Sequence, residues 1–290
     1  VYRYGGAGNN WSVGYQMCSG EFLEEILDKI QREIEHSDIS PVLTMVHSIA
    51  GGTGSGLGTA MTEAVADTYS PLTRMNIAIA PYTFGEVVVQ NYNAVMSFSK
   101  VSRASHGILV FENEVAHDLT TNMRGIMQPS MSDLNKTIAA NIVPFMIPKY
   151  GVSRTGRRKR VHLSDDIMHL AADPCFRFLD VRMTPLTYDK SIDFTFDSWP
   201  SIMSTLYGMQ MTGSFSERGL VSRVNQARKS GNVMRSLSSV LVCRGSDADS
   251  ATQMEGSFHS SPFNDPEDLS RLYSDRLHMT SPVKAYHSPH

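Results

Sequence analysis

Cysteine is scarce in this sequence, and its three copies, Cys18, Cys175 and Cys243, lie far apart. This odd and scattered set predicts neither a disulfide framework nor a zinc site, so we expect a reducing, cytosolic setting. No apolar run reaches the roughly 18 to 20 residues that span a bilayer. An excess of charge is also absent, because 26 Lys and Arg residues oppose 29 Asp and Glu residues. We therefore expect neither a nucleic acid nor a membrane as a partner.

Length and composition are those of a globular protein. The 290 residues are 41% hydrophobic and 19% charged, which suffices for one large domain or two moderate ones. The sequence starts at Val1 without a methionine and is already inside a glycine-rich loop. We therefore expect it to be a fragment of a longer protein.

Apolar runs and helical patterns alternate in the first part of the chain. Residues 42–50, 75–80 and 107–111 are apolar without alternation, which is typical of strands buried on both faces. Residues 57–69 and 92–104 between them have helical spacing. This βαβαβ order predicts an α/β fold with an open, mostly parallel sheet and right-handed crossovers.

The later part of the chain predicts a second α/β domain, beginning near Val161. Its expected strands are residues 176–183 and 239–245, and its expected helix is residues 199–211. Residues 245–290, rich in Ser, Asp, His and Pro, predict little regular structure. A longer helix over 132–147, interrupted late by Pro144, precedes this domain. We divide the chain into a nucleotide-binding domain over 1–130, a core helix over 131–150 and an incomplete second domain over 151–290.

Glycine is concentrated where the first predicted strand meets a helix, at Gly52, Gly54, Gly56 and Gly58. The first N–H groups of a helix lack partners and carry partial positive charge, so they attract anions. Glycines allow a phosphate to approach the backbone and allow positive φ, and nearby hydroxyls can add donors. This stretch contains no lysine and matches neither the Walker motif nor G-x-G-x-x-G. It therefore predicts a phosphate cradle made by the main chain.

A tight turn between strand and helix, without any ligand, would use the same glycines. A second loop favours the phosphate interpretation. Its sequence, GGAGNNW over residues 5–11, also precedes a helical stretch. It can bring Asn9, Asn10 and backbone amides to the carboxyl edge of the sheet, where open α/β sheets bind ligands.

These residues carry a resemblance to the tubulin family. Residues 50–56 resemble its signature loop, and five further motifs follow the family's order and spacing: AGNNW, Tyr92-Asn93, Glu112-Asn113-Glu114, Ser132-Asp133-Leu134-Asn135 and PLTYDKS. The resemblance extends to about Val283. Ala50 replaces the first signature glycine, and PYTFGEVVVQNYN lacks the proline usual before Tyr-Asn in alpha and beta subunits. Both departures are similar to the delta branch of the family.

The resemblance implies a GTP site, with Mg²⁺ in the full-length protein. Ser48 and residues 52–54 match the positions that hold the phosphates, and Ala7–Asn10 match the loop that faces the terminal phosphate. Glu86 lies in the loop that approaches the ribose. The complete implied set is Ala7, Gly8, Asn9, Asn10, Ser48, Ala50, Gly51, Gly52, Thr53, Gly54, Ser55, Gly56, Glu86, Asn113 and Asn135.

The guanine base is expected to meet Asn113 and Asn135, whose amides offer both a donor and an acceptor. Met131 stands where alpha and beta subunits have a tyrosine that stacks on the base. A thioether lies against a purine less rigidly than a ring, so base affinity is expected to be weaker.

The function implied by the resemblance is that of a GTP-binding cytoskeletal subunit. It would assemble or stabilise microtubules of centrioles, basal bodies and cilia, with alpha- and beta-tubulin or other family subunits as partners. It would be located in the cytoplasm, at the cytoskeleton. In the family, an acidic residue after the core helix activates hydrolysis in the neighbouring subunit. The alignment through Asp165 puts Met168 at that position, so we assign no catalytic residue and expect weak or absent hydrolysis.

Two other classes of protein share parts of this pattern. A dinucleotide-dependent cytosolic enzyme should have an acidic residue about 20 residues past the glycine loop. Residues 69–73, Tyr-Ser-Pro-Leu-Thr, contain none. A bacterial relative of tubulin would share the phosphate loop but not Asn113 and PLTYDKS in this arrangement.

Four further features have simpler interpretations. The basic run Arg154–Arg160 is typical of a solvated loop. Asp165, Asp166 and His169 are expected at the surface rather than in a catalytic cluster. Met203–Met211 is expected in a core or an interface. Tyr188 and Lys190, within PLTYDKSIDF, resemble a loop that touches neighbouring protofilaments.

Overall fold

The computed structural model describes residues 5–85, 87–152, 158–186, 198–244, 256–273 and 283–288. The chain forms two compact units. The first contains residues 1–114 and 171–180, and the second contains residues 115–170 and 181–290. The division into domains at residues 130 and 150 remains a prediction. In the described ranges, no helix is long and apolar enough to cross a membrane.

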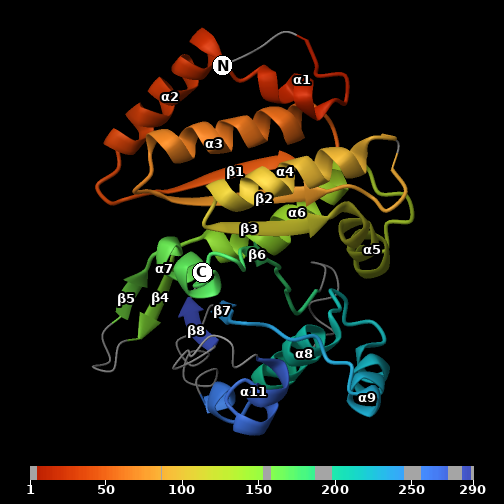
Figure 1. The fold of residues 1–290 in the computed structure, drawn as a ribbon. Helices are drawn as coiled ribbons and strands as arrows, with labels where there is room; N and C mark the ends of the chain where they lie inside the picture. Colours follow the sequence, from red (N-terminus) through yellow and green to blue (C-terminus); the bar gives the residue numbers. More distant parts are fainter. Residues whose placement is uncertain are drawn as a thin grey trace. The chain divides into compact units, whose positions relative to one another are not determined.

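The first unit contains a parallel sheet. Its strands are β1 (Val42–Ser48), β2 (Thr73–Ala80), β3 (Gly107–Glu112) and β6 (Phe178–Leu179), in the order β1-β2-β3-β6 (Figure 1). Ser48 lies opposite Ile79, and Ala80 opposite Glu112, so the carboxyl ends of the first three strands share one edge. The predicted parallel sheet is confirmed. Among the described strands β1 lies at the edge and is only half-buried, which differs from the expected burial on both faces.

Helices α3 (Gly58–Thr68) and α4 (Gln90–Ala104) connect the first three strands as predicted. The π-helical turn η1 (Thr53–Leu57) precedes α3, and helices α1 (Trp11–Gln16) and α2 (Gly20–Glu35) precede β1. The core of the unit contains a cluster of buried side chains from the strands, from α4 and from the residue after β1: Ile49, Ala78, Val101 and Ile108. Burying one face of α4 against β2 and β3 positions the start of the helix near the carboxyl edge of the sheet.

The predicted strand over 176–183 differs from expectation in length and in place. Only Phe178 and Leu179 form β6, and they pair with β3 in the first sheet rather than in the second domain. Arg177 explains this position, because its guanidinium donates to the carbonyls of Ser102, Arg103 and Ser105 at the end of α4. An apolar pattern predicts a strand but not its neighbour.

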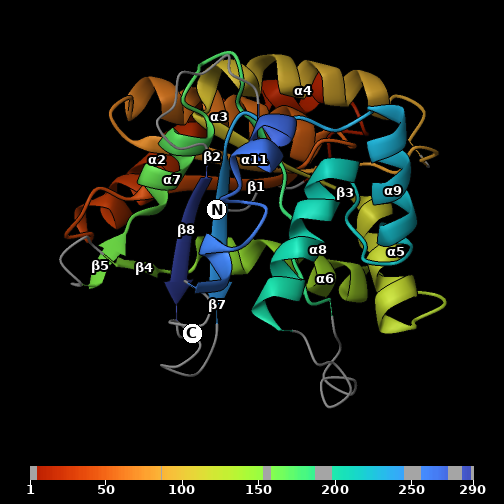
Figure 2. The same cartoon turned by 90° about the horizontal axis from the view of Figure 1, so that it is seen from below.

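The second unit has its own sheet, in the order β5-β4-β8-β7. Strands β7 and β8 are parallel and lie side by side in Figure 2, and β4 pairs antiparallel with both β5 and β8. Helix α5 starts in the first unit and continues into the second. The elements are α5 (Asn113–Arg124), α6 (Met131–Met146), β4 (Lys149–Val152), β5 (Arg158–Val161), α7 (Leu163–Leu170), α8 (Trp199–Thr212), α9 (Leu220–Ser230), β7 (Ser239–Arg244), α11 (Pro266–Leu272) and β8 (Val283–Ser288).

Part of residues 245–290 is regular, which corrects the expectation of little structure there. Helix α11 and strand β8 contribute Leu272 and Val283 to the core of the second unit. Met203 and Met211 of α8 are fully buried in the same core, as predicted for the methionine-rich stretch. The mixed polar sequence of β8 does not predict a strand. Residues 283–288 form one because they pair with β7.

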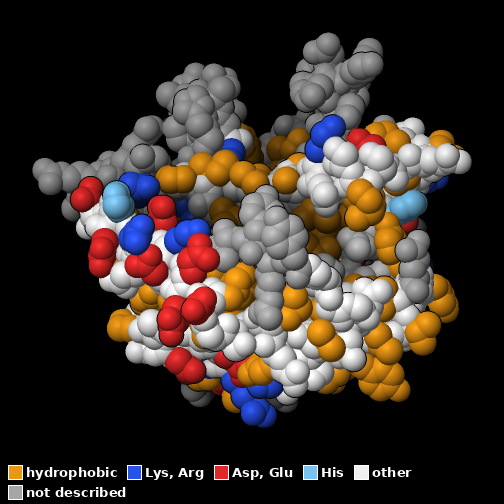
Figure 3. Space-filling model, turned by 90° about the horizontal axis from the view of Figure 1, so that it is seen from above, with side chains coloured by type: hydrophobic (Ala, Val, Ile, Leu, Met, Phe, Trp, Pro, Cys, Tyr) orange, Lys and Arg blue, Asp and Glu red, His pale blue; other side chains and the backbone are white. Residues whose placement is uncertain are grey.

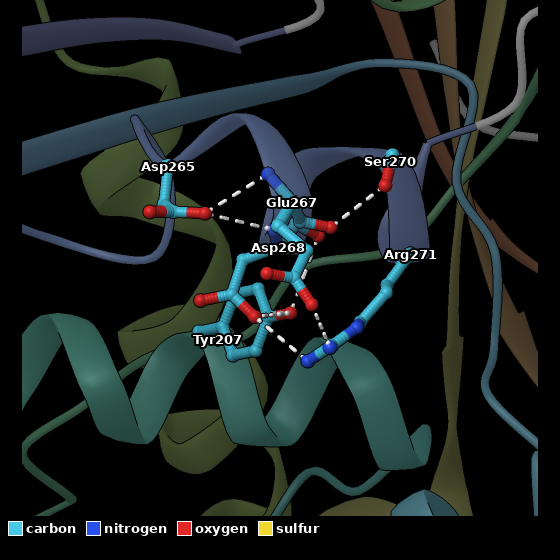
Figure 4. Close-up of polar contacts among 6 residues, drawn as sticks. All are labelled: Tyr207, Asp265, Glu267, Asp268, Ser270 and Arg271. Atoms are coloured by element: carbon cyan, nitrogen blue, oxygen red, sulfur yellow. Dashed lines mark hydrogen bonds and ion pairs between the residues drawn. The ribbon is translucent and has the colours of Figure 1, made fainter.

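Polar contacts hold α11 against α8 (Figure 4). Asp265 caps α11 by accepting from the N–H groups of Glu267, at 2.9 Å, and Asp268, at 3.2 Å. The Tyr207 hydroxyl of α8 donates to the Asp268 carboxylate at 3.1 Å, and Arg271 pairs with Asp268 and Glu267. Burial and the neighbouring Asp268 raise the pKa of Tyr207, so this hydroxyl remains a donor at neutral pH.

Candidate functional site

The loop after β1 presents unpaired amides at the carboxyl edge of the first sheet. Strand β1 ends at Ser48, and η1 begins at Thr53. No backbone hydrogen bond joins the N–H groups of residues 51–54 to another described residue. The side chains of Ser48 and Thr53 are exposed beside them. Four consecutive N–H donors at the start of a helix form a site suited to an anion.

The glycines of this loop are required for close contact between backbones. A Cβ on Gly52 would lie 2.5 Å from the Asn10 nitrogen, and one on Gly56 would lie 2.1 Å from the Trp11 oxygen. A Cβ on Gly54 would lie 2.5 Å from the Ser48 oxygen. None of these three glycines has positive φ, which corrects the expectation for this loop. Positive φ occurs instead in the first loop.

The first loop, residues 5–10, lies directly against the second. Gly8 and Asn9 have φ values of 54° and 57°. The Asn10 side chain caps α1 by accepting from the N–H of Ser12 at 2.9 Å. The Ala7 N–H donates to the Thr53 hydroxyl at 3.4 Å. Loop residues 7–10 and 50–56 from the predicted set are therefore brought together.

Ser55 has a different role from the one expected of it. Its side chain is fully buried, and its hydroxyl donates to the carbonyl of Gly51. It therefore stabilises the loop, and it does not offer a hydroxyl to a ligand as the sequence suggested.

Three buried side chains donate to the carbonyls of the loop. Asn93 donates to the Ala50 oxygen at 2.9 Å, His47 to the Gly54 oxygen at 2.8 Å, and Ser97 to the Ser55 oxygen at 3.2 Å. A carbonyl can only accept, so the His47 Nδ1 must carry the proton in its contact. The sequence analysis does not predict these roles, although the Tyr92-Asn93 pair is one of its family motifs. For Asn93 and Ser97 the available signal is a polar residue on the buried face of a predicted helix.

His47 lies in a polar setting beneath the loop. Its Nε2 lies 3.0 Å from the Asn76 side-chain oxygen, and the Asn76 amide donates to the Ser105 hydroxyl at 2.6 Å. Burial lowers the pKa of His47, against the raising effect of its hydrogen bonds.

An ion-pair network ties α1 to the two longer helices beside it. Lys100 of α4 donates to the Tyr15 hydroxyl at 3.0 Å and pairs with Glu63 of α3 at 3.2 Å. Tyr15 also donates to Glu63 at 2.6 Å and stacks on Trp11. This network positions the helix that follows the first loop.

The two asparagines predicted to read the base lie in different compact units. Asn113 is half-buried and begins α5 directly after β3, at the carboxyl edge of the first sheet. Asn135 is exposed on α6 in the second unit, as is Met131. Their joint action on a base remains a prediction. Glu86 lies outside the described residues, as do Tyr188, Lys190 and residues 154–157 of the basic run.

Helix α7 corrects the expectation that its acidic cluster lies at the surface. Asp166 and His169 are buried, whereas Asp165 and Met168 are exposed. The Asp166 carboxylate pairs with Lys149 at 2.6 Å. Burial lowers the pKa of Lys149, while Asp166 acts to raise it. Asp166 therefore cannot serve as a surface carboxylate in place of Met168.

Comparisons with known proteins agree with the loop geometry. Residues 1–121 match the family model described as Tubulin/FtsZ family, GTPase domain. The chain is 32% identical to the tubulin delta chain of Homo sapiens and 33% identical to that of Mus musculus, over 97% of this chain in each case. It is 35% identical to the tubulin delta chain of Canis lupus familiaris over 74% of this chain and 48% of the dog protein.

The chain spans 62% of the length of the human relative and 61% of the mouse relative. The matched model covers α1 to α4, both loops and the first three strands of the parallel sheet. Through residues 1–121 the chain belongs to the tubulin/FtsZ family, and over most of its length it is similar to tubulin delta chains.

Proposed function

We propose that this protein binds GTP at the loops of residues 5–10 and 48–56 and acts as a cytoskeletal subunit of the tubulin family. One observation carries the proposal: the four adjacent N–H groups of residues 51–54, without backbone partners among the described residues, lie at the carboxyl edge of the sheet. Membership of the tubulin/FtsZ family supports GTP as the anion.

The phosphates would be held by the main chain. Buried side chains satisfy the carbonyls of Ala50, Gly54 and Ser55, so these oxygens need not face the ligand. The exposed hydroxyls of Ser48 and Thr53 would add donors. In this arrangement the loop of Ala7–Asn10 meets the terminal phosphate. A Mg²⁺ ion, when bound, would take phosphate oxygens and water as ligands and reduce the charge of the phosphates.

The base would meet the amide of Asn113, which makes no side-chain hydrogen bond to the described residues, and the amide of Asn135 from α6. A dinucleotide-dependent enzyme is disfavoured by the end of β2. That strand ends at Ala80 and is followed by Pro81 and Tyr82, so it offers no carboxylate for a ribose.

A partner surface is supported by exposed apolar residues next to the site. Val88 lies just before α4, and Tyr92 and Val95 lie in its first two turns; the three are spaced by four and three residues, and each is exposed by 68% or more. Phe84 is exposed in the loop before them. Hydrophobic and charged side chains gather on different parts of the face shown in Figure 3. Adjacent exposed apolar side chains indicate an interaction site. We propose other tubulin-family subunits, including alpha- and beta-tubulin, as its partners.

The cellular role that we propose is the assembly or stabilisation of microtubules at centrioles, basal bodies and cilia. The likeness to tubulin delta chains supports it. The prediction is that the protein localises to these structures when it is tagged in ciliated cells.

Equilibrium titration of the purified protein with GTP and ATP tests the nucleotide assignment. We expect GTP to bind more tightly than ATP. Asn113→Ala should weaken GTP by about tenfold, because a buried donor or acceptor of the base loses its partner, and should leave ATP unchanged. A matched control is Asn122→Ala, on the same helix nine positions later. Equal affinity for GTP and ATP, or no binding of GTP, would overturn the proposal.

A further inference from the structure

We propose that Asn93 is a positioning residue that locks the two loops together and thereby lets the protein distinguish GTP from GDP. The inference rests on the proposed function and adds the residue that couples its two phosphate contacts. Asn93 lies on α4, and its side chain is only 2% exposed.

The Asn93 side chain joins three backbone groups from two segments. Its Nδ2 donates to the Asn9 oxygen at 2.9 Å in the first loop and to the Ala50 oxygen at 2.9 Å in the second loop. Its Oδ1 accepts from the Trp11 N–H at 3.1 Å, at the first residue of α1. The first loop is thus held on both sides of Asn10 by the same amide.

The chemistry of these partners matches an amide and no other short side chain. Two carbonyls require two N–H donors, and one N–H requires one acceptor, which is the capacity that the Asn93 amide offers here. A carboxylate of the same shape would keep the acceptor but would place negative charge against two carbonyls. A hydroxyl supplies one donor and cannot reach all three groups.

The contact matters because little else joins the loops through hydrogen bonds. The other such contact among the described residues is the one from Ala7 to Thr53, at 3.4 Å. Asn9 is the one residue other than glycine with positive φ in the described chain, so its backbone conformation needs support from its surroundings. Loss of the Asn93 amide should let the first loop move while the second keeps its bonds from His47 and Ser97.

This arrangement predicts a selective effect on the terminal phosphate. GDP lacks that phosphate, so its binding depends on the second loop. That loop keeps its hydrogen bonds from His47 and Ser97 when Asn93 is replaced. The binding of GTP depends on both loops, held at a fixed position relative to each other. Asn93→Asp and Asn93→Ser should therefore weaken GTP binding about tenfold more than GDP binding, as expected for the loss of one to two buried hydrogen bonds.

The experiment measures the dissociation constants of GTP and GDP for the wild type and both variants, with the unfolding midpoint of each nucleotide-free protein as the test of folding. Ser97→Ala is the matched control. Ser97 is buried on the same helix one turn later and donates to the Ser55 oxygen at 3.2 Å, but it does not touch the first loop. It should weaken GTP and GDP equally.

A fall in GTP affinity about tenfold larger than the fall in GDP affinity, in either folded variant, supports the role of Asn93. Equal falls for both nucleotides would overturn it, and so would unfolding of both variants while Ser97→Ala stays folded, since the amide would then serve stability alone. A wild type that binds neither nucleotide would overturn the proposed function itself. That result appears without any variant and is therefore distinguishable.

Discussion

At the scale of single residues, the loop glycines are needed for packing as much as for a ligand. Gly52 and Gly56 lie where the backbone of the first loop and α1 meets the second loop. A Cβ at either position would meet main-chain atoms, which cannot rotate away as the end of a side chain can. The effect of substituting each glycine should therefore depend on what its missing Cβ would meet.

Gly52→Ala should destabilise the protein by about 1 to 3 kcal/mol, as overpacking of a tight contact does. Its Cβ would lie 2.5 Å from the Asn10 nitrogen and 2.8 Å from the Ala7 Cβ. Gly51→Ala is the control, because its nearest neighbour is the Asn9 Oδ1 at 3.5 Å. Denaturant unfolding measures the change in the free energy of unfolding for both variants. Equal changes in the free energy of unfolding would contradict the packing argument.

His47 should make stability depend on pH. Because burial lowers its pKa in the folded protein, the unfolded chain binds more protons between that pKa and the ordinary value of about 6.5. The contribution of His47 to the stability of the protein is therefore fully present above about pH 6.5. It is lost as the pH falls from there through the pKa that His47 has in the folded protein.

The test compares the free energy of unfolding of the wild type and His47→Asn across this range. His106, whose pKa is also lowered by burial, changes stability in the same direction in both proteins. The difference between the two curves isolates His47. The wild type should lose more stability on acidification than the variant. Parallel curves would show that His47 does not titrate as proposed.

The sequence predicted the glycine loops but not the side chains that support them. Glycines at a junction of strand and helix are a local signal. Asn93, His47 and Ser97 act across distances in sequence of 7 to 84 residues, and such contacts exist only after folding. The burial of Asp166 has the same origin, since its partner Lys149 is on another element. Two neighbouring aspartates in a sequence, taken alone, predict side chains that lie at the surface.

At the scale of elements, the start of α4 has two faces with different roles. Its buried face carries Asn93 and Ser97, and its opposite face carries the exposed Tyr92 and Val95. A helix of a monomer would place polar residues on that exposed face. The pattern indicates that another molecule covers this part of the helix.

Replacing Val88 and Tyr92 together by serine should weaken co-sedimentation with microtubules at least about tenfold, the equivalent of roughly 1.4 kcal/mol. The stability of the free protein should change by no more than about 0.5 kcal/mol, because both side chains are exposed, by 95% and 71%. Val221→Ser on α9, exposed by 76%, is the control. Unchanged sedimentation of the double variant would remove α4 from the partner surface.

The elements themselves were predictable to different degrees. Strands β2 and β3 and helices α3, α4, α6 and α8 follow from periodicity, because each buries one face or both in its own unit. Strands β6 and β8 do not. Their lengths and partners depend on Arg177, which binds the end of α4, and on pairing with β7. Those contacts join segments that the sequence pattern leaves unrelated.

At the scale of the whole molecule, activity in an assembly depends on surfaces that a neighbouring subunit would meet. Met168, predicted at the position of the family's activating acid, is 53% exposed on α7. The acid two positions earlier, Asp166, is buried with Lys149. On this prediction, the exposed face of α7 offers a thioether where a carboxylate would be needed to activate water.

The protein should not stimulate GTP hydrolysis when it is added to GTP-loaded tubulin. Met168→Glu should increase phosphate release, since a general acid or base contributes about 10² to 10⁴ in rate. Met127→Glu, at another exposed methionine, controls for added charge. Rapid release with the wild type, no faster with Met168→Glu, would show that Met168 does not occupy the catalytic position.

In this protein, the main chain of two loops is proposed to hold the phosphates of GTP. Hydrogen–deuterium exchange of the amides, with and without nucleotide, tests this arrangement, because an N–H that donates to a phosphate is protected from exchange. We predict that GTP slows exchange in residues 48–56 and 5–10, that GDP protects the second loop more than the first, and that ATP protects neither at the same concentration. Unchanged exchange in both loops at saturating GTP would contradict the claim.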